Sequence, residues 1–227
     1  MRARRRRGRG SALLNPFPPL VDITIATIMI LLLVSALHAL QSMRADIYEE
    51  IDRRQKTLRA SVAKTFPDRW GNALKDYVDG EEQKFTFSDR ILFPTSQAVL
   101  DPGGIRLLQQ FGQILRTHQS DLAAIRVEGH TDERPITYPF RSNWELSVAR
   151  ATAVVHILAD PRPGVSLDPK LVTAAGYAEY HPVPGAVGHD ERAWRLNRRI
   201  EIAIRYSPEA ILAQLQEKER DARLAGR

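Results

Sequence analysis

One long apolar run separates a short basic N-terminal segment from the rest of the chain. The run extends from Leu20 to Leu40, with Asp22 as its only formally charged residue and His38 near its far end. A helix of that length spans about 31 Å at ~1.5 Å per residue, close to the ~30 Å hydrocarbon core of a bilayer. The pattern therefore predicts a transmembrane helix over residues 20–40. A cleaved signal peptide is the alternative, but its apolar region would be only about 7–15 residues long.

Residues 41–84 follow the apolar run and are rich in charge. Their apolar positions recur at loosely helical spacing, which favours a helical linker that could pair with a copy of itself. The positions concerned are Ile47, Ile51, Leu58 and Val62. The heptad pattern breaks at Arg54, and a plug that closes a channel is another role open to this linker.

Residues 85–206 show patterns typical of a compact domain in which strands and helices alternate. Asp101 has the character of a helix N-cap, and Ser142 and Glu145 have capping-box spacing. The expected elements are a strand or hairpin at 85–93, a helix from Asp101, a strand at 125–128, a helix at 143–158, and strands at 171–176 and 199–206. This order predicts an α+β fold, an α/β sandwich with a mixed sheet and helices on one face. A polar helix is expected over residues 207–227.

The net charge of +6 comes from the N-terminal tip alone. Residues 1–9 contain six arginines and no acid, while the remaining basic and acidic residues are equal in number. By the positive-inside rule, residues 1–19 stay in the cytoplasm and the C-terminal bulk is exported. Nucleic-acid binding by this tip is the weaker alternative, because no aromatic residue is interleaved with the arginines. The sequence contains no cysteine, which argues against a lipoprotein anchor and against a disulfide.

The segment from Val127 to Leu158 is the most informative about function. It reads VEGHTDERPITYPFRSNWELSVARATAVVHIL, with Asp132 in a loop and Arg150 on the helix that follows. A carboxylate accepts hydrogen bonds from an ammonium, and an arginine presents a planar fork to a carboxylate. The two side chains, held on one rigid frame, would therefore bind a molecule that bears both an amine and a carboxylate. Diaminopimelate in a peptidoglycan stem peptide is such a molecule.

The motifs GHTD, NWELSVARA and NRRIEI closely resemble the MotB and OmpA-like family of peptidoglycan-binding domains, over roughly residues 85–206. In that family the aspartate after GHT and the arginine of the LSxxRA helix hold diaminopimelate, and the resemblance implies these roles for Asp132 and Arg150. The alternative is that Asp132 caps a turn and Arg150 forms a surface ion pair. The loop ERPITYPFRS is longer than the OmpA pattern and lacks its usual glycine, a departure that is MotB-like.

Four further residues complete the expected peptidoglycan site. Asn143 and Leu146 share one helix face with Arg150 by i, i+3 and i+7 spacing. Asn143 would supply polar contacts, and Leu146 would pack against the apolar stem of the ligand. Thr131 is a lesser candidate, and Arg199 in the closing motif is expected to support the acidic loop.

The same resemblance implies a functional role for Asp22. MotB-like stator subunits have one span with an aspartate near its cytoplasmic end, followed by an extracytoplasmic peptidoglycan anchor, and this chain has the same order. The resemblance implies a homodimeric inner-membrane B subunit of a proton-driven motor, in which Asp22 relays protons beside a multi-span MotA-like partner. A flagellar stator and a Zorya-type anti-phage defence motor, with ZorB beside ZorA, both have this layout. The C-terminal domain would then lie in the periplasm.

A passive OmpA-like envelope tether is the competing function, with Asp22 as a helix N-cap. An enzyme is disfavoured, because the sequence shows no set of nucleophile and base, no metal motif and no Walker loop. The pattern implies no cofactor.

Overall fold

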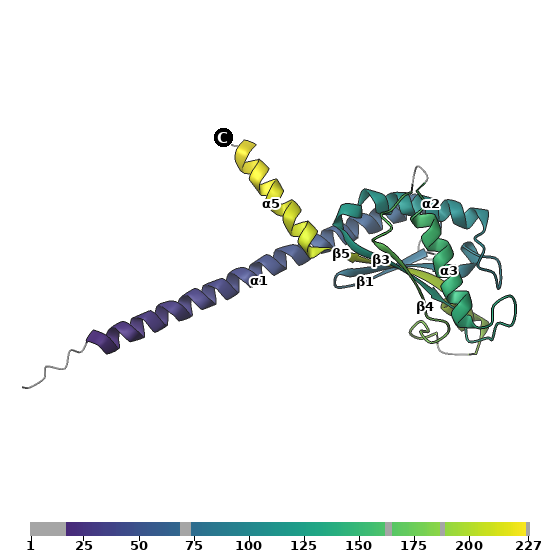
Figure 1. Cartoon of the computed structure of the whole chain (residues 1–227), viewed down its shortest axis with the longest axis horizontal. Coiled ribbons are helices and arrows are strands. Elements are labelled where there is room, and N and C mark those ends of the chain that lie inside the picture. The colour runs from purple at the N-terminus through teal and green to yellow at the C-terminus, as the bar shows by residue number, and fades with distance from the viewer. Residues whose placement is uncertain (1–16, 69–73, 162–164, 187–188, 226–227) are drawn as a thin grey trace, which may run out of the picture. The chain divides into compact units, whose positions relative to one another are not determined.

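The computed structural model describes residues 17–68, 74–161, 165–186 and 189–225, with side chains from residue 23 onwards. The chain divides into two compact units, Met1–Asp46 and Ile47–Arg227 (Figure 1). Helix α1, Phe17–Thr65, includes the boundary between them. The described part of the first unit is therefore helical, whereas every described strand belongs to the second unit.

The helix of the first unit carries an apolar surface. Every side chain from residue 23 to residue 46 is exposed, and α1 is the one helix among the described residues that is long and apolar enough to cross a membrane. The Thr27 hydroxyl lies 2.7 and 3.0 Å from the carbonyl oxygens of Ile23 and Thr24, so its hydrogen bond is made within the helix. An internal partner suits a polar group in an apolar medium. The predicted span lies within this helix. Because α1 begins at Phe17, Asp22 lies inside the helix and is not its N-cap, which corrects the alternative considered from the sequence. The side chain of Asp22 lies outside the described residues.

The second unit is built on a five-stranded mixed sheet with the strand order β1-β2-β5-β3-β4 (Figure 1). The strands are β1 Leu74–Asp79, β2 Glu82–Ser88, β3 Leu122–His130, β4 Val172–Gly176 and β5 Arg199–Tyr206. Strands β3 and β4 pair in parallel, and the other described neighbours are antiparallel. The mixed sheet and its covering helices confirm the α+β fold predicted from the sequence.

Helices pack on one face of this sheet because that face carries the apolar side chains. They are α2 Pro102–Thr117, α3 Asn143–Leu158 and the part of α1 that belongs to the second unit. Phe111 of α2 meets Phe85 and Phe87 of β2 edge-on, with ring centroids 5.2 and 5.1 Å apart. Alternate residues of β5 are fully buried, namely Ile200, Ile202 and Ile204. Asp101 caps α2 by accepting a 2.7 Å hydrogen bond from the Gly103 backbone, as its sequence context predicts.

Gly129 in β3 allows α3 to lie unusually close to the sheet. A Cβ atom at this position would lie 2.1 Å from the carbonyl oxygen of Ser147 on α3, which is far inside any normal contact. The close approach fixes the height of α3 over the sheet. It thereby places the first turn of α3 beside the loop that follows β3.

The predicted linker over residues 41–84 needs correction, because much of it belongs to the folded domain. Strand β1 lies inside that range, and α1 from Ile47 onwards is part of the second unit. Ile51, Leu58 and Val62 are buried in the core of that unit, at 1%, 0% and 0% exposure. These apolar positions therefore face the sheet domain, and the domain begins before residue 85.

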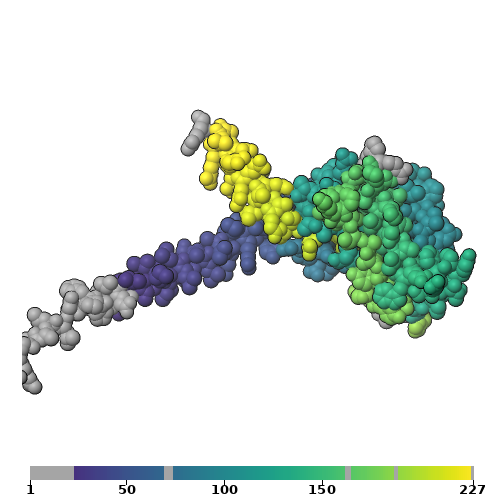
Figure 2. All heavy atoms as spheres, viewed as in Figure 1, coloured from purple at the N-terminus to yellow at the C-terminus, as the bar shows by residue number. Residues whose placement is uncertain are grey.

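Four further elements belong to the described part of the second unit. They are the 3-10 helices η1 Asp89–Ile91 and η2 Gln119–Asp121, with α4 Glu191–Asn197 and α5 Pro208–Ala225. Among these only α5 was predicted from the sequence. Its N-terminus is capped by Ser207, whose hydroxyl accepts a hydrogen bond from the Ala210 backbone at 3.2 Å. Beyond Leu215 every described residue of α5 is exposed (Figure 2).

Candidate functional site

A cavity of about 670 Å³ lies beside the start of α3 and the loop after β3. It brings together five of the side chains predicted from the sequence: Thr131, Asp132, Asn143, Leu146 and Arg150. All five are buried, although they come from two separate segments. Asp89 in η1, Arg134 in the long loop and Arg198 just before β5 line the same cavity.

Helix α3 positions three of these side chains on one face. Its N-cap is Ser142, whose hydroxyl accepts a 3.3 Å hydrogen bond from the Glu145 backbone, as the capping-box spacing predicts. The inward face carries Asn143, Leu146 and Arg150, which are 8%, 5% and 2% exposed. Helical spacing alone therefore brings these three residues to the cavity.

Asn143 ties the loop after β3 to the first turn of α3. Its Nδ2 donates to the backbone carbonyl of Asp132 at 3.2 Å and to that of Arg134 at 3.1 Å. The amide is therefore used to hold the loop in place. As a result, Asp132 and Arg150 are held on one frame even though they lie on different elements.

Arg150 is a buried residue with fixed partners. Its Nε donates to the Gln97 carbonyl at 2.8 Å, and its Nη1 donates to Asp89 Oδ2 at 3.3 Å. The guanidinium also lies over the Phe93 ring, 5.1 Å from its centroid. Burial lowers the pKa of Arg150, and the nearby carboxylate of Asp89 opposes this effect. These contacts contradict the alternative of a surface ion pair at this position.

Asp132 is held by two arginines and by its own loop. Arg134 donates from Nη2 at 2.6 Å and from Nε at 3.1 Å, and Arg198 donates from Nη1 at 2.5 Å. The other carboxylate oxygen accepts from the Arg134 backbone at 3.1 Å, so Asp132 does cap a turn as well. Burial acts to raise the pKa of Asp132, but the hydrogen bonds from Arg134 and Arg198 outweigh it and keep this pKa below its usual value.

Two buried oxygens at this cavity have no hydrogen-bond partner within the described part of the chain. They are Asp89 Oδ1 and Thr131 Oγ1. Burial raises the pKa of Asp89, and Arg150 and Arg198 offset this only in part. Because buried polar groups are nearly always paired, the two oxygens mark places where a bound molecule or water would find a partner.

Arg199 does not line this cavity, contrary to the sequence prediction. Residues of a strand alternate between its two faces, and Arg199 points to the face opposite Ile200. There its Nε donates to Glu201 at 2.5 Å, and its Nη2 donates to the carbonyl of His181 at 3.2 Å. Arg198, one residue earlier and outside the strand, takes the place at Asp132 that the prediction gave to Arg199.

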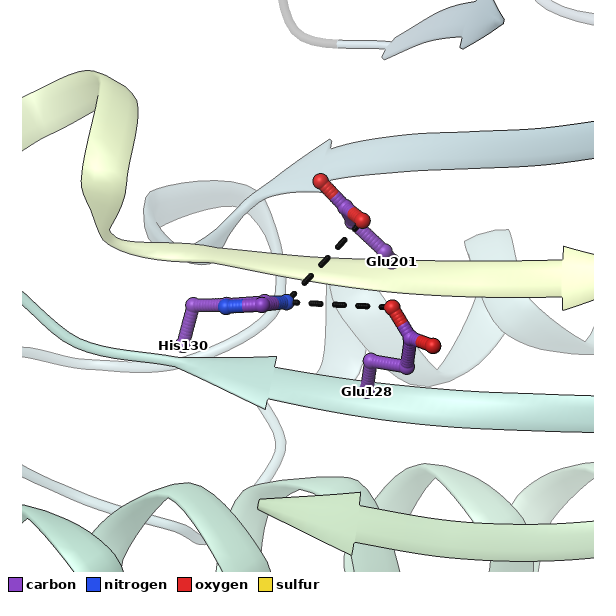
Figure 3. A group of neighbouring side chains, drawn as sticks. All are labelled: Glu128, His130 and Glu201. Atoms are coloured by element: carbon purple, nitrogen blue, oxygen red, sulfur yellow. Dashed lines mark ion pairs between the residues drawn. The ribbon is translucent and has the colours of Figure 1, made fainter. Parts of the chain in front are cut away.

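A second polar cluster lies on the sheet face away from α2 and α3, beside a larger cavity of about 1250 Å³. Figure 3 shows His130 pointing toward Glu128 of its own strand and Glu201 of β5, with Nε2 3.9 Å from each carboxylate. These three donor atoms lie within 4.8 Å of one another, a set that a divalent metal could use.

The ammonium of Lys84 already acts as the cation of this cluster. It lies 3.4 Å from the carboxylate of Glu128 and 3.7 Å from that of Glu201. Arg126 and Arg199 take the other oxygens of the two acids, at 2.6 and 2.5 Å. The negative charge is thus balanced from within the chain, and the cluster is best described as an internal ion network.

Comparison with known proteins identifies relatives of this chain. Residues 92–195 match the model of the OmpA family. Motility protein B of Bacillus subtilis is 30% identical over 151 residues, which cover 66% of this chain and 55% of that protein. A peptidoglycan-associated lipoprotein of Pseudomonas putida is 33% identical over 132 residues, covering 55% of this chain and 70% of the relative. The solved structure of a MotB-like protein from Desulfovibrio vulgaris has the same fold, with a TM-score of 0.59, 20% identity, and coverage of 70% and 99%.

The fold, the site and these matches define the class of protein: the chain belongs to the OmpA family. Within that family it is a MotB-like protein with an OmpA domain. The chain spans about half the length of the Bacillus relatives that it matches, 46% of one and 55% of the other.

Proposed function

We propose that this protein anchors an inner-membrane complex to peptidoglycan, and that the cavity beside α3 binds the stem peptide. The observation that carries the proposal is that a buried arginine and a buried acid line the same cavity and are held on one frame. Arg150 and Asp132 are 2% and 6% exposed, and Asn143 joins the segments that hold them. The names of the peptidoglycan-associated lipoproteins among the relatives support the same ligand.

Diaminopimelate is the component of the stem peptide that this site would recognise. Its ammonium would bind at Asp132, and its carboxylate would face the arginines of the cavity. Asp89 Oδ1 and Thr131 Oγ1 are further acceptors within reach of a bound molecule, since both line the cavity without a partner in the described structure. Leu146 would pack against the methylene stem of the ligand, as its place in the cavity allows.

We further propose that the protein is a membrane-bound B subunit of a proton-driven motor. The apolar helix is consistent with the membrane-bound part of this proposal. In this arrangement residues 1–19 lie in the cytoplasm, residues 20–40 span the inner membrane, and the sheet domain lies in the periplasm. Asp22 would relay protons beside a multi-span MotA-like or ZorA-like partner, with two copies of this chain in the complex. A flagellar stator and a Zorya-type defence motor both fit these features.

A passive envelope tether is the second candidate, supported by the match to the Pseudomonas putida lipoprotein over 70% of its length. In that case Asp22 would have no part in proton transfer. The two candidates share the peptidoglycan site and differ in the role of this one side chain.

Sedimentation with purified diaminopimelate-type sacculi tests the shared anchoring function. The full-length chain, kept in detergent micelles, is expected to sediment with the sacculi. Asp132→Asn keeps a turn-capping oxygen but removes the charge, and this variant is expected to stay in the supernatant. Asp52→Asn changes an acid on α1 that is 54% exposed, and this control should sediment like the parent chain. Sedimentation of Asp132→Asn at the parent level would overturn the proposal, and so would a parent chain that does not sediment.

A further inference from the structure

The guanidinium of Arg134 contacts the carboxylate of Asp132, the group proposed above to bind the ligand ammonium. Two of its nitrogens contact the same carboxylate oxygen, at 2.6 and 3.1 Å. The Asp132 side chain is 7% exposed, whereas the Arg134 side chain is 47% exposed and lies over the ring of Trp194 at 4.4 Å. The acid is thus fixed, and the cation that covers it reaches in from the surface.

The ion-paired network at the cavity is balanced in charge. It consists of three acids, Asp89, Asp132 and Glu191, and three arginines, Arg134, Arg150 and Arg198. A ligand ammonium that displaced Arg134 from Asp132 would leave this guanidinium with Glu191 at 3.8 Å as its remaining acidic partner. A ligand that also carries a carboxylate would supply the missing partner and leave the network neutral.

Arg134 is the most exposed of the three arginines in the network, at 47%. Arg150 is 2% exposed and is bound to Asp89 and to the Gln97 backbone. Arg198 is 18% exposed and contacts three acids at once, so moving it would break three ion pairs. Arg134 belongs to the long loop after β3, and a change of its rotamer would give up its contacts with Asp132 and Trp194 while leaving Arg150 and Arg198 in place.

We propose that Arg134 is an exchangeable cation that selects a zwitterionic ligand end. The ligand ammonium takes its place on Asp132, and the released guanidinium then binds the carboxylate on the same ligand carbon. This inference rests on the proposed function, because it concerns the same cavity. It assigns specificity to Arg134: the free end of diaminopimelate is preferred over lysine, which has the ammonium and lacks that carboxylate.

Two tripeptides test this selectivity by isothermal titration calorimetry on the full-length chain in detergent. Both have the sequence L-Ala-γ-D-Glu followed by either meso-diaminopimelate or L-lysine, so that they differ in one carboxylate. The parent chain is expected to bind the diaminopimelate peptide about tenfold more tightly, the size expected for one charge-assisted contact. In Arg134→Gln the preference should fall below about threefold, while affinity for the lysine peptide is kept or increased, because Asp132 is uncovered.

The matched control is Arg141→Gln, which removes an exposed arginine from the same loop. It should keep the preference of the parent chain. An unchanged preference in Arg134→Gln would overturn this inference and leave the anchoring function standing. Binding of neither peptide by the parent chain would overturn both.

Fluorescence of Trp194 distinguishes the proposed exchange from a purely structural role of Arg134, because only the exchange predicts a change in emission when the ligand binds. In a chain with Trp70→Phe and Trp144→Phe, Trp194 is the remaining tryptophan, and its ring carries the Arg134 guanidinium. Adding the diaminopimelate peptide should shift its emission, because the cation leaves the ring. The same shift in a chain that also carries Arg134→Gln would overturn the exchange.

Discussion

Arg150 and Asp89 form an ion pair in the interior of the domain, 61 positions apart in the chain, with Nη1 3.3 Å from Oδ2. Their side chains are 2% and 7% exposed. The pair connects α3 to the 3-10 turn that follows β2. The arginine of the candidate site therefore stabilises the fold as well as the cavity.

We predict that Arg150→Ala abolishes sedimentation with sacculi and lowers the free energy of unfolding by ~3–5 kcal/mol, because it breaks a buried ion pair and leaves Asp89 with Arg198 at 3.6 Å as its remaining cation among the described residues. Urea denaturation followed by circular dichroism measures the second effect. The double variant with Asp89→Ala should lose less stability than the sum of the two single changes, since each single change already breaks the ion pair between the two residues. Additive losses, or undiminished sedimentation of Arg150→Ala, would contradict this description of the pair.

Local sequence patterns predicted the elements whose signals are local. Helix α3 begins at Asn143 and ends at Leu158, as its capping box and apolar spacing indicate, and β5 follows the alternation of Arg199–Tyr206. Strand β1 escaped prediction because its sequence, LKDYVD, has a single buried residue, Leu74, and the strand lies at the edge of the sheet. Its place is determined by pairing with β2, which no local pattern shows.

The candidate site was predictable to the extent that helical spacing determines it. Asn143, Leu146 and Arg150 reach the cavity together because they share one face of α3. Asp89 and Arg198 reach it by tertiary contacts across 61 and 66 positions. Asp89 lies in none of the motifs used to predict the site, whereas Arg198 belongs to the NRRIEI motif, in which the prediction chose Arg199. The choice between Arg198 and Arg199 depends on where β5 begins, which the sequence pattern did not resolve.

The cluster of Glu128, His130 and Glu201, on the sheet face away from α2 and α3, predicts that the protein loses stability in acid. Burial acts to raise the pKa of Glu128, but His130, Arg126 and Lys84 lower it to about 2, against an ordinary value of 4.5. As the pH falls, the unfolded chain therefore binds a proton at Glu128 before the folded chain does. Glu128 contributes ~3 kcal/mol to the free energy of unfolding; this contribution is complete above pH 4.5 and is lost as the pH falls toward 2.

His130 acts in the same direction. Burial lowers its pKa below the usual 6.5 in spite of Glu128 and Glu201 nearby, so folding favours the neutral ring. Protonation of the unfolded chain below pH 6.5 then costs stability. Urea midpoints at pH 7, 5.5 and 4 should fall in that order, and Glu128→Gln should flatten the lower part of this dependence. The same slope in the variant would show that other groups cause the acid sensitivity.

Lys84 is predicted to stabilise the folded domain through its ion pairs with this cluster. The carboxylates of Glu128 and Glu201 raise its pKa despite the opposing effect of burial. Lys84→Ala should cost ~1–3 kcal/mol in urea denaturation, because both acids lose a charged partner. The variant also frees the space between the carboxylates and His130, so Zn²⁺ should raise the thermal midpoint of Lys84→Ala and leave that of the parent chain unchanged. If Zn²⁺ raised the thermal midpoint of the parent chain equally, the description of this cluster as an internal ion network would be wrong.

Gly129→Ala is predicted to displace α3 and weaken the site without touching it. The added Cβ would lie 2.1 Å from the Ser147 carbonyl, so the helix must move away from the sheet. We expect a loss of ~1–3 kcal/mol in urea denaturation, typical of overpacking, together with weaker sedimentation with sacculi. Gly80→Asn is the control: its backbone φ of +57° suits asparagine, and no atom lies near its Cβ position. Parent-like stability of Gly129→Ala would contradict the close approach.

Substitutions of Asp22 should affect the function of the membrane helix and leave peptidoglycan binding unchanged. A proton relay at Asp22 requires a side chain that binds and releases a proton, which glutamate retains and asparagine lacks. Asp22→Asn should therefore abolish the motor-dependent phenotype of the native host, while Asp22→Glu keeps part of it. Both variants should reach the membrane in normal amounts and sediment fully with sacculi, because the cavity beside α3 is built from residues of the sheet domain alone. If Asp22→Asn functions like the parent chain in the host, Asp22 is not a proton relay and the passive tether is the better description of the protein.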